Sequence, residues 1–140
     1  MPSRRPSADI QSVLMPAGRL TYRVEDGLLI LTAVGSPTFL QRRATFEEVR
    51  ADPAVAERAP LLLDTRALTD VMTSTEGQQR LSELVTGLGS KMGHACAVLS
   101  SGWNPLATHF FQVTAGEHGV RVGLFDDETT ARRWLAATGR

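Results

Sequence analysis

The sequence predicts an α/β domain built on a single mixed sheet, in which an N-terminal β-hairpin is followed by alternating helices and parallel strands. Two alternating apolar segments flank an Asp-Gly turn signal at residues 26–27. Three short apolar runs near residues 61, 95 and 120 are separated by stretches with helical periodicity. Strands separated by helices form right-handed crossover units, so these three strands should be parallel. The expected order of elements is ββαβαβαβα.

The chain divides into a flexible lead over residues 1–18 and one α/β domain over residues 19–140. The lead mixes Pro, Ser, Arg and Asp with little apolar sequence, which is typical of an unfolded segment. After it, Leu20, Tyr22 and Val24 alternate with polar residues. The turn at Asp26-Gly27 then leads into a β-rich run over residues 28–34, and this pattern indicates the hairpin.

A helix reaching to about Ala51 should follow the hairpin. We expect Ser36 to cap this helix and Pro37 to occupy its first position. The apolar side of the helix would contain four residues: Phe39, Leu40, Phe46 and Val49. The next apolar run, over residues 60–64, is too short for a buried helix and predicts a central strand ending at Asp64.

The second helix has the clearest signature in the sequence. Residues 73–76 match a capping box, and apolar residues follow at positions i, i+3, i+4 and i+7. These apolar residues are Leu81, Leu84, Val85 and Leu88. A buried strand over residues 94–100, a helix opened by Asn104-Pro105 and a last strand over residues 120–125 come next. A final helix should begin after Asp126 or Asp127 and pack through Ala131, Trp134 and Leu135.

Charge and cysteine content exclude several classes of protein. The 15 Lys and Arg residues are balanced by 15 Asp and Glu residues, so no excess of basic charge is present for nucleic acid or anionic membranes. No apolar stretch is long enough for a membrane span. The single Cys96 cannot form an internal disulfide and fits a reducing, cytoplasmic location.

Neither a metal nor another cofactor is expected. His94 and Cys96 would share one face of a strand, but two ligands are too few for a structural zinc site. The glycine-rich motifs that bind dinucleotides or nucleoside triphosphates do not occur in the sequence.

The candidate functional residues lie at the carboxyl ends of the predicted parallel strands, where ligands usually bind in such sheets. Asp64 and Arg66 end the central strand, and the hydroxyls of Thr73, Ser74 and Thr75 surround the start of the second helix. One interpretation is that these residues only cap the helix and hold loop amides. The other is a binding surface at which the helix start would stabilise an added phosphate, opposed by the nearby Glu76.

Two further sites remain open as alternatives. Trp103, Phe110 and Phe111 could line a pocket for a small apolar ligand or lipid, or they could simply fill the core. Hydrolase chemistry at Ser100 or Ser101, with His109 or His118 and Asp64, is the least supported reading, because the nucleophile elbow motif G-x-S-x-G is missing.

The element order over residues 19–138, the run Leu62–Leu68 and the segment Thr73–Gly77 resemble the STAS-type fold of bacterial anti-anti-sigma factors. They also resemble small single-domain bacterial proteins of STAS-like and CRAL-TRIO-like type. The resemblance implies a non-enzymatic regulatory domain that binds another protein, with a homodimer as a further candidate assembly. In regulatory members, a kinase partner phosphorylates a Ser or Thr in an Asp-Ser-x-Gly-like stretch at the start of the second helix. The matching positions here are Thr73 and Ser74, with Met72 in place of the acidic residue.

Overall fold

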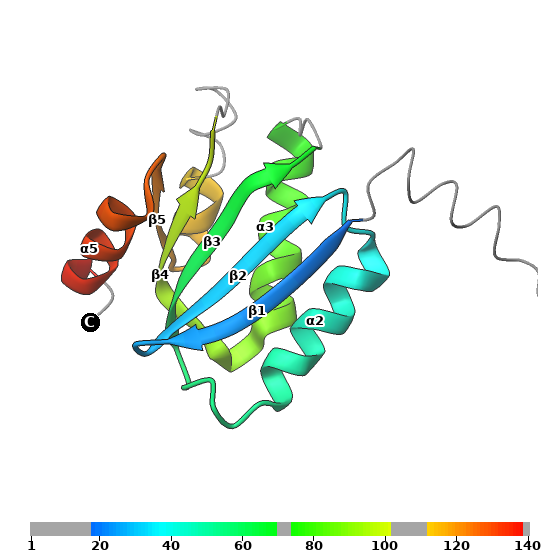
Figure 1. The fold of residues 1–140 in the computed structure, drawn as a ribbon, viewed down its shortest axis with the longest axis horizontal. Coiled ribbons are helices and arrows are strands. Elements are labelled where there is room, and N and C mark those ends of the chain that lie inside the picture. The colour runs from blue at the N-terminus through cyan, green and yellow to red at the C-terminus, as the bar shows by residue number, and fades with distance from the viewer. Residues whose placement is uncertain (1–17, 70–73, 102–111, 139–140) are drawn as a thin grey trace, which may run out of the picture.

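The computed structural model describes residues 18–69, 74–101 and 112–138. It contains one five-stranded sheet with the strand order β1-β2-β3-β4-β5, in which β1 is antiparallel to β2 and each later neighbour is parallel. The predicted mixed α/β sheet is therefore confirmed (Figure 1). The elements are β1 Arg19–Glu25, β2 Leu28–Gly35, α2 Phe39–Ala51, β3 Ala59–Leu68, α3 Ser74–Leu88, a 3-10 turn Gly89–Lys91, β4 Met92–Leu99, β5 Arg121–Phe125 and α5 Glu128–Thr138. Residues 112–117 are also helical.

The N-terminal hairpin turns at Asp26 and Gly27, as the sequence predicts. Both residues have positive φ, 53° for Asp26 and 78° for Gly27. A two-residue turn with this geometry matches the right-handed twist of the flanking strands, and Asp followed by Gly adopts it readily. The hairpin register pairs Glu25 with Leu28, directly across the turn.

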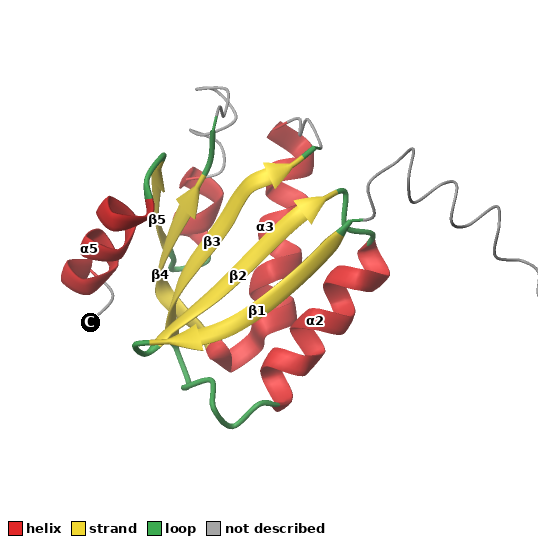
Figure 2. Ribbon diagram, viewed as in Figure 1, coloured by secondary structure: helices red, strands yellow, loops and turns green. Residues whose placement is uncertain are grey.

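Helices cover the two faces of the sheet unequally. Helices α2 and α3 lie along one face, and α5 lies against the other face beside β4 and β5 (Figure 2). Residues on the α2 and α3 face form the larger core cluster, with Leu31, Leu61 and Val98 of the sheet buried completely. The smaller cluster joins Ile30, Leu62 and several other sheet residues to Ala131 and Leu135 of α5. On that second face, α5 covers the side of β3, β4 and β5 and leaves the side of β1 and β2 without a helix (Figure 2).

The start of α2 differs from the prediction. Thr38, and not Ser36, caps the helix, so Pro37 precedes the cap. The Thr38 hydroxyl accepts a hydrogen bond from the Gln41 amide at 3.2 Å, and the Gln41 side chain accepts one from the Thr38 amide at 2.7 Å. This reciprocal pair satisfies two amides that the helix leaves unpaired, which a serine two residues earlier could not do. Phe39 and Leu40 were expected on the buried side, but they are 53% and 72% exposed.

Strand β3 is longer than predicted, because it continues four residues beyond Asp64 to Leu68. Its second half pairs with the end of β2, after an irregularity between Thr32 and Val34. The polar residues in this half have partners within the sheet. The hydroxyl of the buried Thr65, for example, donates a hydrogen bond to the Leu99 carbonyl at 2.7 Å. Asp64 therefore lies inside a strand, and not at its end.

The later elements follow the prediction closely. Helix α3 buries Leu81, Leu84 and Leu88 and ends at Leu88, directly before Gly89, which has a φ of 55°. Helix α5 begins after Asp127, whose carboxylate accepts a hydrogen bond from the Thr130 amide at 3.1 Å. The predicted helix at Asn104-Pro105 lies mostly outside the described residues. No described helix is long and apolar enough to cross a membrane.

Candidate functional site

Asp64 and Arg66, two of the predicted site residues, form an ion pair on β3. The Asp64 carboxylate accepts hydrogen bonds from the Arg66 Nε at 3.0 Å, from its Nη2 at 2.8 Å and from its backbone amide at 3.1 Å. The Arg66 guanidinium holds the pKa of the Asp64 carboxyl below its usual range. Asp64 is therefore a poor proton acceptor, since its charge is already stabilised by its neighbour.

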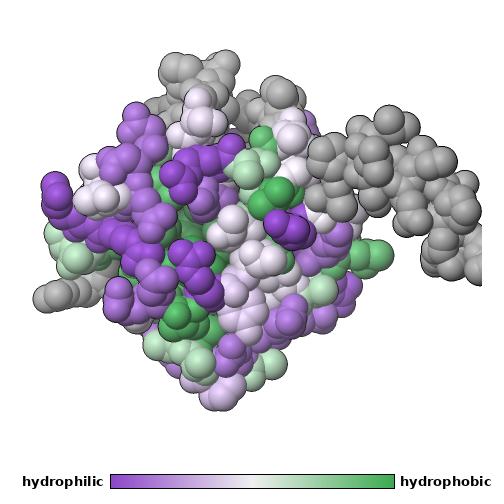
Figure 3. Space-filling model, viewed as in Figure 1, coloured by the Kyte–Doolittle hydropathy of each residue, from purple (hydrophilic) through white to green (hydrophobic). Residues whose placement is uncertain are grey.

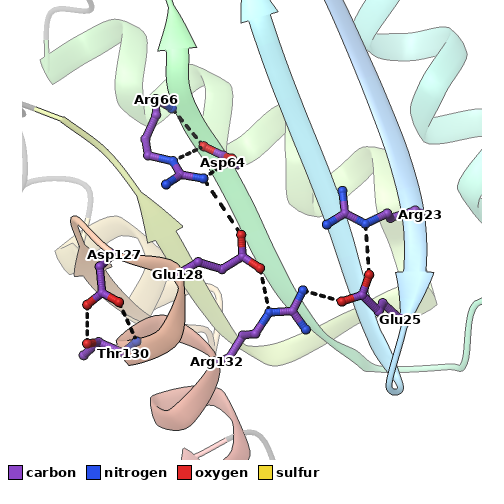
Figure 4. Close-up of polar contacts among 8 residues, drawn as sticks. All are labelled: Arg23, Glu25, Asp64, Arg66, Asp127, Glu128, Thr130 and Arg132. Carbon is purple, nitrogen blue, oxygen red and sulfur yellow. Dashed lines mark hydrogen bonds and ion pairs between the residues drawn. The ribbon is translucent and has the colours of Figure 1, made fainter.

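This pair is one end of a row of alternating charges that runs across the open sheet face (Figure 4). The Arg66 guanidinium lies 3.9 Å from Glu128 of α5, and Glu128 accepts a hydrogen bond from Arg132 at 2.8 Å. Arg132 reaches Glu25 at the end of β1, at 2.6 Å. The row ends with a contact of 3.3 Å between Glu25 and Arg23. Hydrophilic side chains accordingly gather on the part of this face nearest α5 (Figure 3).

The charge row connects α5 to the sheet by polar contacts. An isolated exposed ion pair contributes little to stability, but several shared charges in good geometry contribute more. Arg132 contributes two of these contacts, because it donates to Glu128 one turn earlier in α5 and to Glu25 across the fold. The spacing of Glu128 and Arg132 in the sequence could have revealed the first of these contacts.

The other predicted site residues lie at the start of α3. Ser74 is the first residue of the helix, Thr75 is exposed and Glu76 is the acidic residue of the first turn. Thr73 lies outside the described residues. Unpaired amides and the helix dipole make such a start favourable for an anion, whereas the Glu76 charge works against it.

The structure places the two halves of the predicted site on different faces of the sheet. The Asp64 and Arg66 side chains lie on the α5 face, because Arg66 contacts Glu128. Helix α3 packs on the opposite face through Leu81 and Leu84. The two halves approach one another only where β3 ends and α3 begins, at the same edge of the sheet (Figure 1).

A cavity of about 90 Å³ lies under α2 and α3, and sequence reasoning did not predict it. Its walls are apolar, from leucine side chains of β1, β2, β3 and α3 and from Phe46 of α2. Arg42 and Glu83 join the two helices at its border through contacts of 2.6 and 3.1 Å, and both side chains are largely buried. The Arg42 side chain is therefore held away from solvent. Its partner is 41 residues away, so no local pattern could have revealed the pair.

The described residues give little information on the two alternative sites, the aromatic pocket and the hydrolase site. Trp103, Phe110, Phe111 and His109 lie outside them, so the apolar pocket at these aromatic residues stays a prediction. His118 is exposed in a turn, and the Ser100 amide donates to the Phe125 carbonyl at 3.0 Å.

His94 and Cys96 do not form a joint site. Cys96 is buried, and burial raises its pKa to about 12. His94 is exposed, and its Nε2 lies 2.9 Å from a guanidinium nitrogen of Arg58. Within the described ranges, no three His, Cys, Asp or Glu side chains group in a way that could hold a metal ion.

Comparison with known proteins supplies the fold type. One match is an uncharacterised protein of the DUF3478 family from Shewanella loihica with a SpoIIAA-like fold. It has 17% sequence identity and a TM-score of 0.61, and the match covers 85% of this chain and 95% of that one. This chain has a SpoIIAA-like fold. A second match, at 18% identity and a TM-score of 0.53, is an anti-sigma factor antagonist from Mycobacterium paratuberculosis, over 86% of this chain and 95% of that one.

The SpoIIAA-like fold confirms the predicted STAS-like architecture. The CRAL-TRIO part of the predicted resemblance receives no support from these structures. No family model matches the sequence, and no curated protein does.

Proposed function

We propose that this protein is a non-enzymatic regulatory domain that binds another protein through Asp64, Arg66 and the start of α3 at Thr73, Ser74 and Thr75. The observation that carries the proposal is the structural match to an anti-sigma factor antagonist over nearly the whole of both chains. Because proteins with a common fold can differ in function, the proposal also rests on the surface formed by Asp64, Arg66 and the start of α3.

The surface offers a partner two kinds of recognition. The Arg66 side chain is 41% exposed, and its fixed pairing with Asp64 presents the guanidinium in one orientation. Thr75 adds an exposed hydroxyl in the first turn of α3. Preorganised polar groups lose little conformational freedom on binding, which favours specific recognition over tight but indiscriminate contact.

Phosphorylation at the start of α3 would control this binding. A phosphate on Ser74 would lie beside unpaired helix amides, which stabilise its charge, and beside Glu76, which repels it. The added charge would alter the surface that the partner contacts without unfolding the helix. Mass spectrometry of the protein purified from its native host tests this directly, because the peptide with residues 73–75 should appear with one added phosphate.

The partner is tested by affinity capture from the native host with wild-type protein and three variants as bait. Ser74→Glu and Arg66→Ala should lose a partner that the wild type retains. Ser82→Glu is the matched control, because it places the same charge at an exposed position two turns further along α3. The proposal fails if no protein is retained by the wild type, or if the control loses it equally.

A second copy of the chain is also a candidate partner. Static light scattering of the purified wild type measures its mass in solution. A dimer that dissociates in Arg66→Ala but persists in Ser82→Glu would place the homodimer contact on the same surface.

A further inference from the structure

We infer that the cavity under α2 and α3 binds a small carboxylic acid with a short, branched or unbranched apolar body. This site is separate from the surface proposed for a protein partner, because the cavity lies between the two helices and the sheet.

Of the two arginines at the border of the cavity, Arg42 is paired with a carboxylate and Arg80 is not paired with any described residue. The guanidinium of Arg42 is fully engaged, since two nitrogens contact Glu83 and the third donates to the Pro37 carbonyl at 2.6 Å. Arg80 also lines the cavity, but it forms no hydrogen bond or ion pair with any residue in the described part of the chain. Among the described residues, one positive charge at the border therefore has no bonded opposite charge, and a ligand with one negative charge would complement it.

The position of Arg80 determines where the negative charge of the ligand would lie. Arg80 is half-buried and lines the cavity, so its charge can serve a ligand that enters from solvent. A carboxylate at this point would accept two parallel hydrogen bonds from the guanidinium, which is a strong and directional contact. The rest of the ligand would then extend between walls that are mainly apolar, where the Thr65 hydroxyl is already bonded to the Leu99 carbonyl.

The volume limits the apolar body. An enclosed cavity of about 150 Å³ holds a benzene molecule, so the roughly 90 Å³ found here has room for about three to five carbon atoms. Long fatty acids are too large for this space. The ligand class is therefore a short-chain monocarboxylate, with 3-methylbutanoate as a suitable probe.

The test measures binding of three probes to the full chain by calorimetry. We expect 3-methylbutanoate to bind with a dissociation constant on the order of 1 mM or lower. Acetate has the charge without the body, and 3-methylbutan-1-ol has the body without the charge, so both should bind more weakly. Arg80→Met keeps the length of the side chain and should weaken 3-methylbutanoate by about tenfold or more, with no effect on the alcohol. Arg133→Met is the matched control, because Arg133 is exposed on α5 and distant from the cavity lining.

A second variant tests the cavity itself. Ala33 lines it and is buried, so Ala33→Leu would fill part of the space and should abolish binding of 3-methylbutanoate while Arg80 is retained. Circular dichroism establishes whether this variant folds. If it does not fold, the binding measured with Arg80→Met tests the inference alone. Three results would each overturn the inference. They are equal binding of 3-methylbutanoate to wild type and Arg80→Met, binding of acetate as tight as that of 3-methylbutanoate, and no binding of any probe.

Discussion

Gly87 shows how one missing side chain lets two helices approach. A Cβ atom placed on this residue of α3 would lie 2.6 Å from the ring of Phe46 on α2, and Phe46 is itself buried in the core. Real atoms do not approach so closely, so the ring or the helix would have to move. The glycine weakens α3 as an isolated helix, and packing against Phe46 compensates for it.

We therefore expect Gly87→Ala to destabilise the protein by about 1 to 3 kcal/mol, because overpacking outweighs the better helix propensity of alanine. Gly116→Ala is the matched control, since a Cβ there meets nothing within 4 Å and Gly116 is also helical. The control should be neutral or slightly stabilising. Urea unfolding of both variants measures the difference, and a Gly87→Ala protein as stable as the control would contradict the close packing of α2 and α3.

At the scale of elements, the ion pair between α2 and α3 differs from an ordinary surface pair. Arg42 and Glu83 are 12% and 19% exposed, whereas Arg43 and Glu47 on the outer side of α2 are 63% and 54% exposed and 3.8 Å apart. Removing one member of a buried pair leaves the other charge without its partner in a poorly solvated place. Removing one member of an exposed pair leaves a charge that water can solvate.

The expected result is that Glu83→Gln lowers the free energy of unfolding by about 2 to 4 kcal/mol. Glu47→Gln should change it by less than about 0.5 kcal/mol, because water replaces the lost contact. Chemical denaturation at neutral pH provides the measurement. Similar losses in the two variants would mean that the Arg42 and Glu83 contact is no more buried than a surface pair.

Elements with local sequence signals could be predicted, and elements that depend on distant contacts could not. The hairpin and α3 were predictable because their signals are local, the Asp26-Gly27 turn and the leucine spacing of α3. The start of α2 was not, because Ser36-Pro37 and Thr38 each carry a helix-start signal, and the reciprocal contacts of Thr38 with Gln41 select the second. The end of β3 was missed because the apolar run stops at Leu63, while polar residues continue the strand through contacts with distant segments.

The candidate site was predictable only in part. The pairing of Asp64 with Arg66 follows from their spacing on a strand, where alternate residues share a face. The contacts of Arg66 with Glu128, and of Arg132 with Glu25, join residues far apart in the chain, so no single segment of sequence contains them. The cavity likewise forms only where α2 and α3 pack on the sheet, so no single segment contains its lining.

For the whole molecule, the reaction rate of the Cys96 thiol measures how often the fold opens. Cys96 is completely buried in β4, a strand paired on both sides, and burial raises the pKa of its thiol to about 12. The thiolate that reacts with disulfide reagents is thus scarce in the folded protein and becomes available only when the core opens. Labelling should require unfolding of the sheet as a whole.

We expect a thiol reagent at pH 8 to label Cys96 at least about a thousandfold more slowly than an exposed thiol, since stable domains open that rarely. A Ser82→Cys substitution in a Cys96→Ala background supplies the exposed thiol for comparison. Urea should accelerate labelling of Cys96 and leave that of the control nearly unchanged. Rapid labelling of Cys96 in the absence of denaturant would show that the sheet opens locally at β4 and β5.

The strand order has a consequence for synthesis of the chain on the ribosome. Because the sheet is arranged in sequence order, each new strand pairs with the one made just before it. The sheet therefore grows in one direction, from β1 toward β5, and at every stage the most recently paired strand is its open edge. That edge is apolar when β3 and β4 occupy it, and an open apolar edge attracts other chains. The nascent protein is most prone to aggregation in the interval after β3 has paired and before β5 and α5 have emerged.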